Sequence, residues 1–253
     1  MKCPPQGQTG RIAVGTITTS LKSPAATHLP AVSLPHPSMP SRRCFFSLLL
    51  AAALPVGAAE TVVSTLTLEE LAGATAWPEP LRQLMAYALG LTKRKLGYHF
   101  GSADPEQAGM DCSGTIHHLL SHARLKHVPR QSDAFYKWVR DACNLTAVTG
   151  MPSLTDPVLD QLKPGHLLFW TGTYDTGVRT LPVSHVMIYL GKTTDGRPVM
   201  FGASDGRPYR GKRHNGVSVF DFRLPSGTTK SRFVGYGPPP GLDLSEVRPV
   251  PPG

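Results

Sequence analysis

Apolar residues recur at helical spacing in three stretches of the chain, all of them before residue 144. The first follows Pro80, with apolar side chains at positions 81, 84, 85, 88, 89 and 91, and predicts a helix that ends near Gly97. The second follows Cys112, where positions 116, 119, 120 and 123 share one face, and the third covers about 133–143. The chain before residue 144 is therefore expected to supply three helices.

Beyond residue 163 the pattern changes to short apolar runs bounded by turn residues. Pro164-Gly165 opens a run over 166–170, and further runs cover 183–191, 199–204 and 216–224. These runs predict four strands of one antiparallel sheet, with short turns such as Asp195-Gly196 between them. Helices followed by strands are typical of an α+β domain.

The two ends of the chain differ from this middle part. Residues 39–59 combine a basic start, an apolar run and small residues before Glu60, which is the pattern of an export signal, and Arg42-Arg43 resembles a twin-arginine signature. The run is too short for a permanent membrane anchor. We expect a disordered leader or mis-assigned start (1–38), the export signal (39–59), a helical lead-in (60–84), a globular domain (85–237) and an extended, partly disordered Pro-rich tail (238–253). The protein is then periplasmic or secreted.

The formal charge of +9 does not indicate a nucleic-acid binder. Residues 1–59 hold five of the 26 basic residues and no acidic one, which leaves 21 basic against 17 acidic residues, a surplus of +4 spread along the chain. A solvated surface explains this surplus better than a phosphate-binding patch. After signal removal only Cys112 and Cys143 remain, too few for a disulfide framework, so the core must hold the fold.

Cys112 has the surroundings of a reactive thiol. Only the thiolate is nucleophilic, and the N–H groups and dipole at a helix N-terminus favour it. A single cysteine is more often a small buried hydrophobe. Here, however, polar Asp111 and Ser113 flank it, which suits a cleft better than a packed core.

A thiol mechanism also needs a base, and His185 is the best candidate. Strand alternation over 183–191 predicts that Val183, His185, Met187 and Tyr189 lie on one face. Without the cysteine motif, an ordinary strand histidine would be the simpler interpretation.

Four motifs occur in order: Tyr98 with Gly101, Asp111-Cys112-Ser113-Gly114, the stretch 162–165 (LKPG) and the stretch 184–191 (SHVMIYLG). Together they resemble the NlpC-type cell-wall cysteine peptidases over about residues 85–237. The resemblance implies a papain-like catalytic domain with helices packed on one antiparallel sheet of about five to six strands. It also implies an endopeptidase that cuts the γ-D-glutamyl to diamino acid bond of peptidoglycan stem peptides. We further expect a monomer that uses no cofactor or metal.

Carried over by motif position, Cys112 is the nucleophile and His185 the base. Tyr98 lines the cleft near the thiol, and Asp111 and Ser113 hold the free amine of the substrate. The family's usual orienting residue, often His, falls here on Gly202. Three other residues could orient the imidazole, and spacing does not choose among them: Ser204, two positions further on the same face, Asp205 or His214.

The sequence departs from the family pattern once more at His166, where an acidic residue is common, and we interpret His166 as structural. Positions 130–132, together with the aromatic residues at 135, 136 and 138, could form a cleft wall. An aromatic cluster at helical spacing is more often part of the core, however, and we expect the core here.

Three alternatives compete with the peptidase. His118 and His122 share a helix face and could bind zinc, although a third ligand is not evident. The glycine at position 202 also suits a catalytically degenerate wall-binding module. Finally, an amidase or acyl transferase could use the same fold and thiol.

Overall fold

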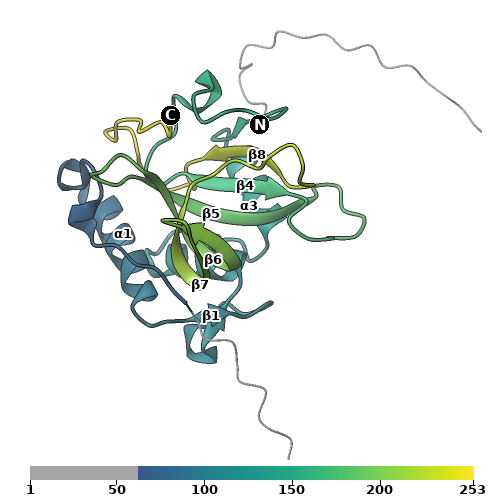
Figure 1. Cartoon of the computed structure of the whole chain (residues 1–253), viewed down its shortest axis with the longest axis horizontal. Helices are drawn as coiled ribbons and strands as arrows, with labels where there is room; N and C mark the ends of the chain where they lie inside the picture. Colours follow the sequence, from purple (N-terminus) through teal and green to yellow (C-terminus); the bar gives the residue numbers. More distant parts are fainter. Residues whose placement is uncertain (1–61) are drawn as a thin grey trace, which may run out of the picture. The chain divides into compact units, whose positions relative to one another are not determined.

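The computed structural model describes residues 62–253. Three α-helices lie along the first half of this part: α1 (Glu79–Thr92), α2 (Cys112–His122) and α3 (Ser132–Asp141). Short 3₁₀ turns occupy η1 (Leu68–Glu70), η2 (Ala74–Ala76), η3 (Pro105–Gln107) and η4 (Pro157–Leu159). All three predicted helices are therefore present (Figure 1).

Helix α1 is shorter than expected. Pro80 lies in its first turn, where a missing N–H costs nothing, and its apolar stripe is buried as predicted. It ends at Thr92 and not near Gly97, because Lys95 adopts the left-handed conformation and Gly97 already belongs to the two-residue strand β1 (Gly97–Tyr98). Strand β1 pairs in parallel with β2 (Gly109–Met110), which brings Tyr98 next to the start of α2.

Six strands form one antiparallel sheet, in the order β3-β8-β4-β5-β6-β7. Their bounds are β3 (Thr146–Ala147), β4 (Leu167–Thr171), β5 (Val183–Lys192), β6 (Pro198–Tyr209), β7 (Lys212–Asp221) and β8 (Arg232–Gly237). The α+β class is confirmed. The sequence pattern located β4 to β7, while β3 and β8 were not located.

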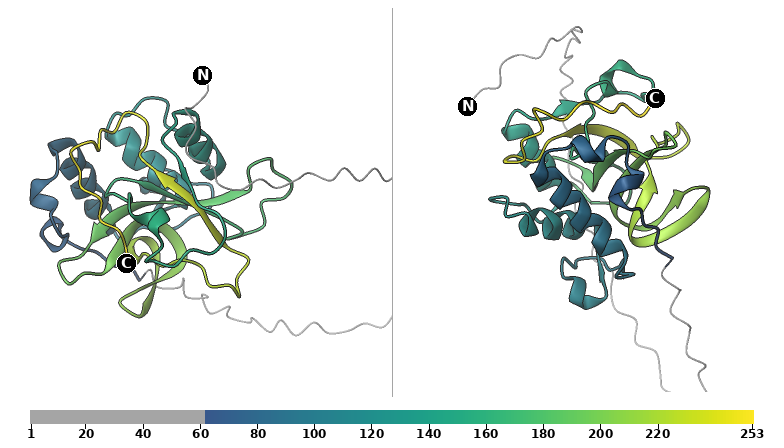
Figure 2. Two further views of the ribbon diagram at one scale, coloured as in Figure 1. Left: turned by 90° about the horizontal axis from the view of Figure 1, so that it is seen from above. Right: turned by 90° about the vertical axis from the view of Figure 1, so that its left-hand side faces the viewer.

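The helices cover one face of the sheet, and the segment between β3 and β4 packs on the other. Helices α2 and α3 pack on β5, and α1 packs on β7 (Figures 1 and 2). This face holds the larger apolar cluster, which includes Met85, Ile116 and Val186. On the opposite face, Trp170, Met187 and Tyr189 pack against Leu159 and Leu162 from the segment between β3 and β4.

The predicted alternation along β5 fails at one residue. Trp170 pairs with His185 but Thr171 pairs with Val183, so the register shifts and Ser184 is the extra residue. As a result Val183 joins the helix-side cluster, whereas Met187 and Tyr189 lie in the opposite cluster. The bulge falls directly before His185.

The lead-in and the tail both pack against the domain. The backbone carbonyls of Val62 and Ser64 accept hydrogen bonds from the N–H groups of Asn215 and Val219, and Leu66 is buried. Residues 62–84 therefore share the core of the remaining described chain. The tail is irregular, as expected, but it is not a loose end. Leu242, Leu244 and Val247 are buried in the core, and a disordered tail is therefore wrong. The sequence lacks helical or strand periodicity there, but burial needs only a few well-spaced apolar side chains.

The expected leader (1–38) and export signal (39–59) lie outside the described residues. Within 62–253, no helix is long and apolar enough to serve as a membrane span.

Candidate active site

Cys112 is the first residue of α2, as the sequence predicted. Asp111 caps this helix, because one of its carboxylate oxygens accepts a hydrogen bond from the backbone N–H of Gly114. The backbone N–H groups of the first helical turn point toward the end of the helix where Cys112 lies. The cap therefore fixes both the start of α2 and the position of the thiol.

The sulfur lies at the bottom of a small pocket. The side chain of Cys112 is buried, and its Sγ lies 3.8 Å from the hydroxyl oxygen of Ser132. The pocket has a volume of about 250 Å³ and is lined by Tyr98, Phe100, Asp111, Cys112, Arg130 and Tyr174, among others. We call it the thiol pocket.

Burial raises the pKa of the Cys112 thiol, and the charge of Asp111 raises it further. Hydrogen bonds from the backbone of Val186 and from the Ser132 hydroxyl work in the opposite direction, since they favour the thiolate. Val186 follows His185 on β5. The sulfur therefore contacts β5 at the residue that follows His185.

Arg130 neutralises the carboxylate that was expected to bind a substrate amine. Its two terminal nitrogens donate to the two oxygens of Asp111 at 3.1 and 3.0 Å, and one of them also donates to the Ser113 hydroxyl at 3.0 Å. The second oxygen of Asp111 also accepts from the Gly101 N–H at 2.8 Å. Both oxygens of Asp111 thus already have donors, and a substrate amine would have to share them.

His185 lies on β5 with its imidazole almost completely buried. It faces the edge of Trp170, with 5.7 Å between the ring centroids. Burial lowers the pKa of the imidazole well below its usual value, and the charge of Arg207 lowers it further. Among the described residues His185 Nε2 has no hydrogen-bond partner, and no hydrogen bond links the imidazole to Cys112.

None of the three candidate orienting residues is hydrogen-bonded to His185 in the described structure. Ser204 is buried and its hydroxyl accepts from the Gly206 N–H at 3.3 Å. Asp205 is exposed. The ring of His214 packs against Tyr209, and its Nδ1 is buried without a partner in the described part of the chain.

The structure gives a physical reason for the glycine at position 202. A Cβ built on Gly202 would lie 2.9 Å from Cγ of Met187, which is closer than real Cβ atoms approach. Met187 lies two residues after His185 on β5. The Met187 side chain thus fills the space that a side chain at position 202 would need.

Thiol and imidazole line two adjoining pockets. The second pocket, of about 670 Å³, contains His185, Ser204, Asp205, Arg207, Arg223 and Lys230, and we call it the imidazole pocket. Tyr98, Phe100 and Tyr174 line both pockets. The rings of Phe100 and Tyr174 pack edge to face, with 6.1 Å between their centroids. Burial raises the pKa of the Tyr98 hydroxyl, which therefore stays protonated.

The expectation of a core position holds for only part of the cluster that begins at residue 130. Phe135 is buried in the core, whereas Arg130 and Ser132 line the thiol pocket. The pairing of Arg130 with Asp111 had no sequence signal, because 19 residues separate the two. The same holds for Arg207, which reaches the site only through the fold of β6.

The two residues of the zinc alternative serve the packing of α1 on α2. Tyr87 bonds the His118 ring at 2.8 Å and stacks on His122 with 3.5 Å between centroids. Within 62–253 no cluster of three potential metal ligands exists.

His166 has a structural environment. It is buried, and its Nδ1 accepts from the Lys163 N–H at 3.3 Å. Burial and the nearby charge of Lys163 lower its pKa to about 3.

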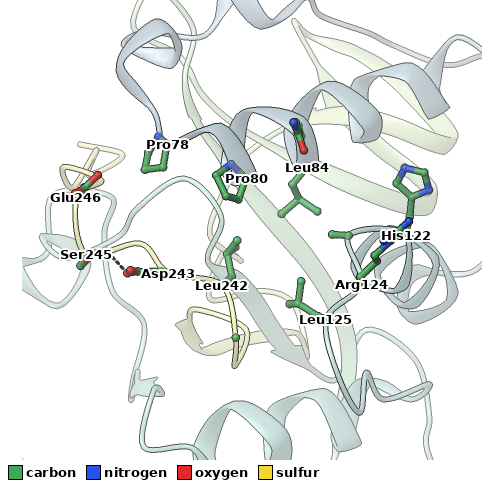
Figure 3. A pocket seen from close by; sticks show the side chains of 13 residues that line it. Pro78, Pro80, Leu84, His122, Arg124, Leu125, Leu242, Asp243, Ser245 and Glu246 are labelled. Atoms are coloured by element: carbon green, nitrogen blue, oxygen red, sulfur yellow. Dashed lines mark hydrogen bonds between the residues drawn. The ribbon is translucent and has the colours of Figure 1, made fainter.

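A larger hollow of about 780 Å³ lies at the other end of α2, between α1 and the tail. Figure 3 shows Leu84, Leu125 and Leu242 converging on it, with Asp243 and Glu246 at its rim. It contains His122 and not Cys112, and is therefore a separate feature from the site.

No family model matches this chain, and no curated protein sequence matches it either.

Proposed function

We propose that this protein is an extracytoplasmic cysteine endopeptidase that hydrolyses peptidoglycan stem peptides at the γ-D-glutamyl to diamino acid bond. One observation carries the proposal: Cys112 starts a capped helix and lines an accessible pocket, and its sulfur is hydrogen-bonded to the backbone of Val186, the residue after His185. The four ordered sequence motifs supply the substrate class. The export signal expected at 39–59 supplies the route to the wall.

In this mechanism the thiol proton of Cys112 passes to His185 while the sulfur adds to the carbonyl carbon. The backbone N–H of Cys112 stabilises the oxyanion that forms. The C–N bond then breaks as the imidazolium returns the proton to the leaving amine, which leaves a thioester on Cys112. Water activated by His185 hydrolyses the thioester and restores the thiol.

The neighbours of the thiol have supporting roles. Tyr98, as a neutral hydroxyl, donates to the substrate near the thiol. Asp111 and Ser113 hold the free amine of the stem peptide, with Arg130 sharing the carboxylate and limiting how strongly the amine is bound. Burial keeps the Cys112–His185 pair neutral at rest, so proton transfer accompanies attack.

Mass spectrometry of digested wall fragments tests the proposal. Purified full-length protein is incubated with isolated stem peptides, and Cys112→Ala and His185→Ala serve as the inactive variants. We expect wild type to release products cut after the γ-D-glutamyl residue, and each variant to lose at least about a thousandfold in rate while still folded. Full activity in either variant would end the mechanism.

A second candidate is a wall-binding module without activity. It is favoured by the Nε2 of His185, which has no partner among residues 62–253, and by the Met187 side chain in the place of an orienting residue. Binding of stem peptides by wild type without any cleavage, at equal affinity in Cys112→Ala, would favour it. Cleavage of another amide but not of stem peptides would favour an amidase or acyl transferase.

A further inference from the structure

In the proposed mechanism, the imidazole pocket is the side of the cleft that would receive the leaving group. In a thiol mechanism the base that takes the thiol proton returns it to the departing nitrogen, and must therefore lie beside that nitrogen. His185 lines this pocket, whereas Cys112 lines the other one. The residue whose amine is released consequently sits among the side chains around His185. This step rests on the proposed function.

Positive charge dominates the lining of this pocket. Arg207, Arg223 and Lys230 contribute cations and Asp205 the one carboxylate among the lining residues. Arg223 is already paired with Asp221 outside the lining at 2.9 Å. Two cations of the lining, Arg207 and Lys230, are therefore left with only one carboxylate in the lining, the exposed Asp205, to balance their charge.

Among the cations of the imidazole pocket, Arg207 is the one that shares a packing partner with His185. Its guanidinium lies over the Trp170 ring, 5.0 Å from the centroid, and the same ring packs against His185. Its charge interacts with His185, Cys112 and the exposed Asp205. Within the described chain its guanidinium has neither an ion pair nor a hydrogen bond.

A partly buried guanidinium without an acidic partner is an unusual arrangement. Such groups are normally paired, because desolvation of a charge is costly unless a counter-charge replaces the water. Burial lowers the pKa of Arg207 only to about 10, so the group stays charged at neutral pH. Its planar fork matches a carboxylate with two parallel hydrogen bonds.

We propose that Arg207 binds the free α-carboxylate of the residue whose amine leaves, so that the enzyme prefers stem peptides ending at that residue over longer or amidated ones. The carboxylate lies one carbon away from the scissile nitrogen, which puts it on the same side of the cleft as His185. Trp170 holds the guanidinium in place through its ring face. Arg207 is thus a specificity-determining residue.

Kinetics on a matched substrate pair test this inference. Two tripeptides that differ only in a C-terminal carboxylate or carboxamide are cleaved by wild type, Arg207→Met and Arg210→Met. Arg210 is the control, because it is exposed on the β6–β7 turn, stacks on Tyr209 and does not line the pocket. We expect wild type and Arg210→Met to favour the carboxylate at least about tenfold in kcat/KM, and Arg207→Met to lose this preference.

The outcomes separate the inference from the proposed function. Equal rates on both peptides in wild type, or an unchanged preference in Arg207→Met, would overturn the role of Arg207 and leave the peptidase standing. If neither peptide is cleaved, calorimetric binding to Cys112→Ala decides the matter. Binding that is about tenfold tighter for the carboxylate and loses this difference in Cys112→Ala/Arg207→Met supports the inference, and equal binding of both peptides overturns it.

Discussion

At the scale of single residues, the site combines a thiol and an imidazole, and burial shifts the pKa values of both in the direction that favours their neutral forms over an ion pair. The pKa of Cys112 is raised and that of His185 is lowered, in both cases chiefly by desolvation of the charged form. A resting thiolate–imidazolium pair would require the opposite shifts. In the proposed mechanism, proton transfer is therefore expected to depend on the substrate.

Alkylation of Cys112 by iodoacetamide should follow this shift. Since only the thiolate reacts, and since its pKa is raised, the rate should keep increasing with pH through about pH 9, where an ordinary thiol with a pKa of about 8.5 approaches its plateau. Mass mapping of the Cys112 peptide at a series of pH values gives the profile. A plateau already reached below pH 7 would show that a resting ion pair exists.

The sequence allowed the two central residues to be chosen, and not their surroundings. A cysteine between polar neighbours just before a helical pattern predicts a thiol at a helix N-terminus, and α2 begins at Cys112. Nothing local indicates that Met187 fills the space beside Gly202, or that Arg207 lies over Trp170. Both facts depend on the register between β5 and its neighbours.

At the scale of elements, the start of α2 is the structural centre of the site. Asp111 caps the helix, pairs with Arg130 ahead of α3 and accepts from Gly101 in the loop after β1. One carboxylate thus joins three segments around the thiol. The same residue is expected to contribute to both stability and substrate binding.

Replacement of Asp111 by Ala should lower the free energy of unfolding by about 2 kcal/mol, because the helix loses its cap and Arg130 loses its partner. Urea denaturation measures the change. The control is Asp104→Ala, an exposed cap of the three-residue η3, for which about 0.5 kcal/mol is expected. Equal effects at the two positions would contradict a central role for the Asp111 junction.

The sheet shows where sequence patterns are sufficient and where they are not. Long apolar runs located β4 to β7. The pattern did not reveal β3, which has two residues, or β8, which contains two glycines among its six residues. The bulge at Ser184 was also invisible, since an extra residue in one strand can be identified only against its partner.

At the scale of the whole described domain, the C-terminal tail completes the hydrophobic core. The tail inserts Leu242, Leu244 and Val247 into the helix-side cluster, and Lys163 donates to the Leu244 carbonyl at 3.0 Å. Further along, the Val250 carbonyl accepts from the Tyr189 hydroxyl at 2.8 Å. The tail is thus part of the folded unit that carries the site.

Leu244→Ala should therefore destabilise the protein by about 2 to 3 kcal/mol, the usual cost of removing a buried leucine side chain. Thermal or urea unfolding measures it. The neighbouring Glu246→Ala is the matched control, since Glu246 is exposed and should change stability by less than about 0.5 kcal/mol. A Leu244→Ala variant as stable as wild type would contradict a packed tail.

Stability should also depend on pH through His166. Its pKa is lowered to about 3 in the folded state, so below about pH 6.5 the unfolded chain binds a proton that the folded chain does not, and stability falls as pH decreases. From pH 7 to pH 5 the loss from this residue is about 2 kcal/mol. The buried His185 acts in the same direction.

Urea unfolding of His166→Gln at pH 7 and pH 5 checks this. The free energy of unfolding should decrease clearly less between the two pH values in this variant than in wild type. His127→Asn is the control, because His127 is exposed and Asn tolerates its left-handed backbone. Wild-type pH dependence in His166→Gln would refute the buried neutral histidine.

The most direct test of the central claim is to trap the covalent intermediate. A reaction of wild-type protein with a stem peptide is quenched in acid, and the protein is digested and mapped by mass spectrometry. The account predicts an acyl adduct on the Cys112 peptide that is absent in Cys112→Ala and greatly reduced in His185→Ala. An adduct on another residue, or continued hydrolysis in Cys112→Ala, would contradict it.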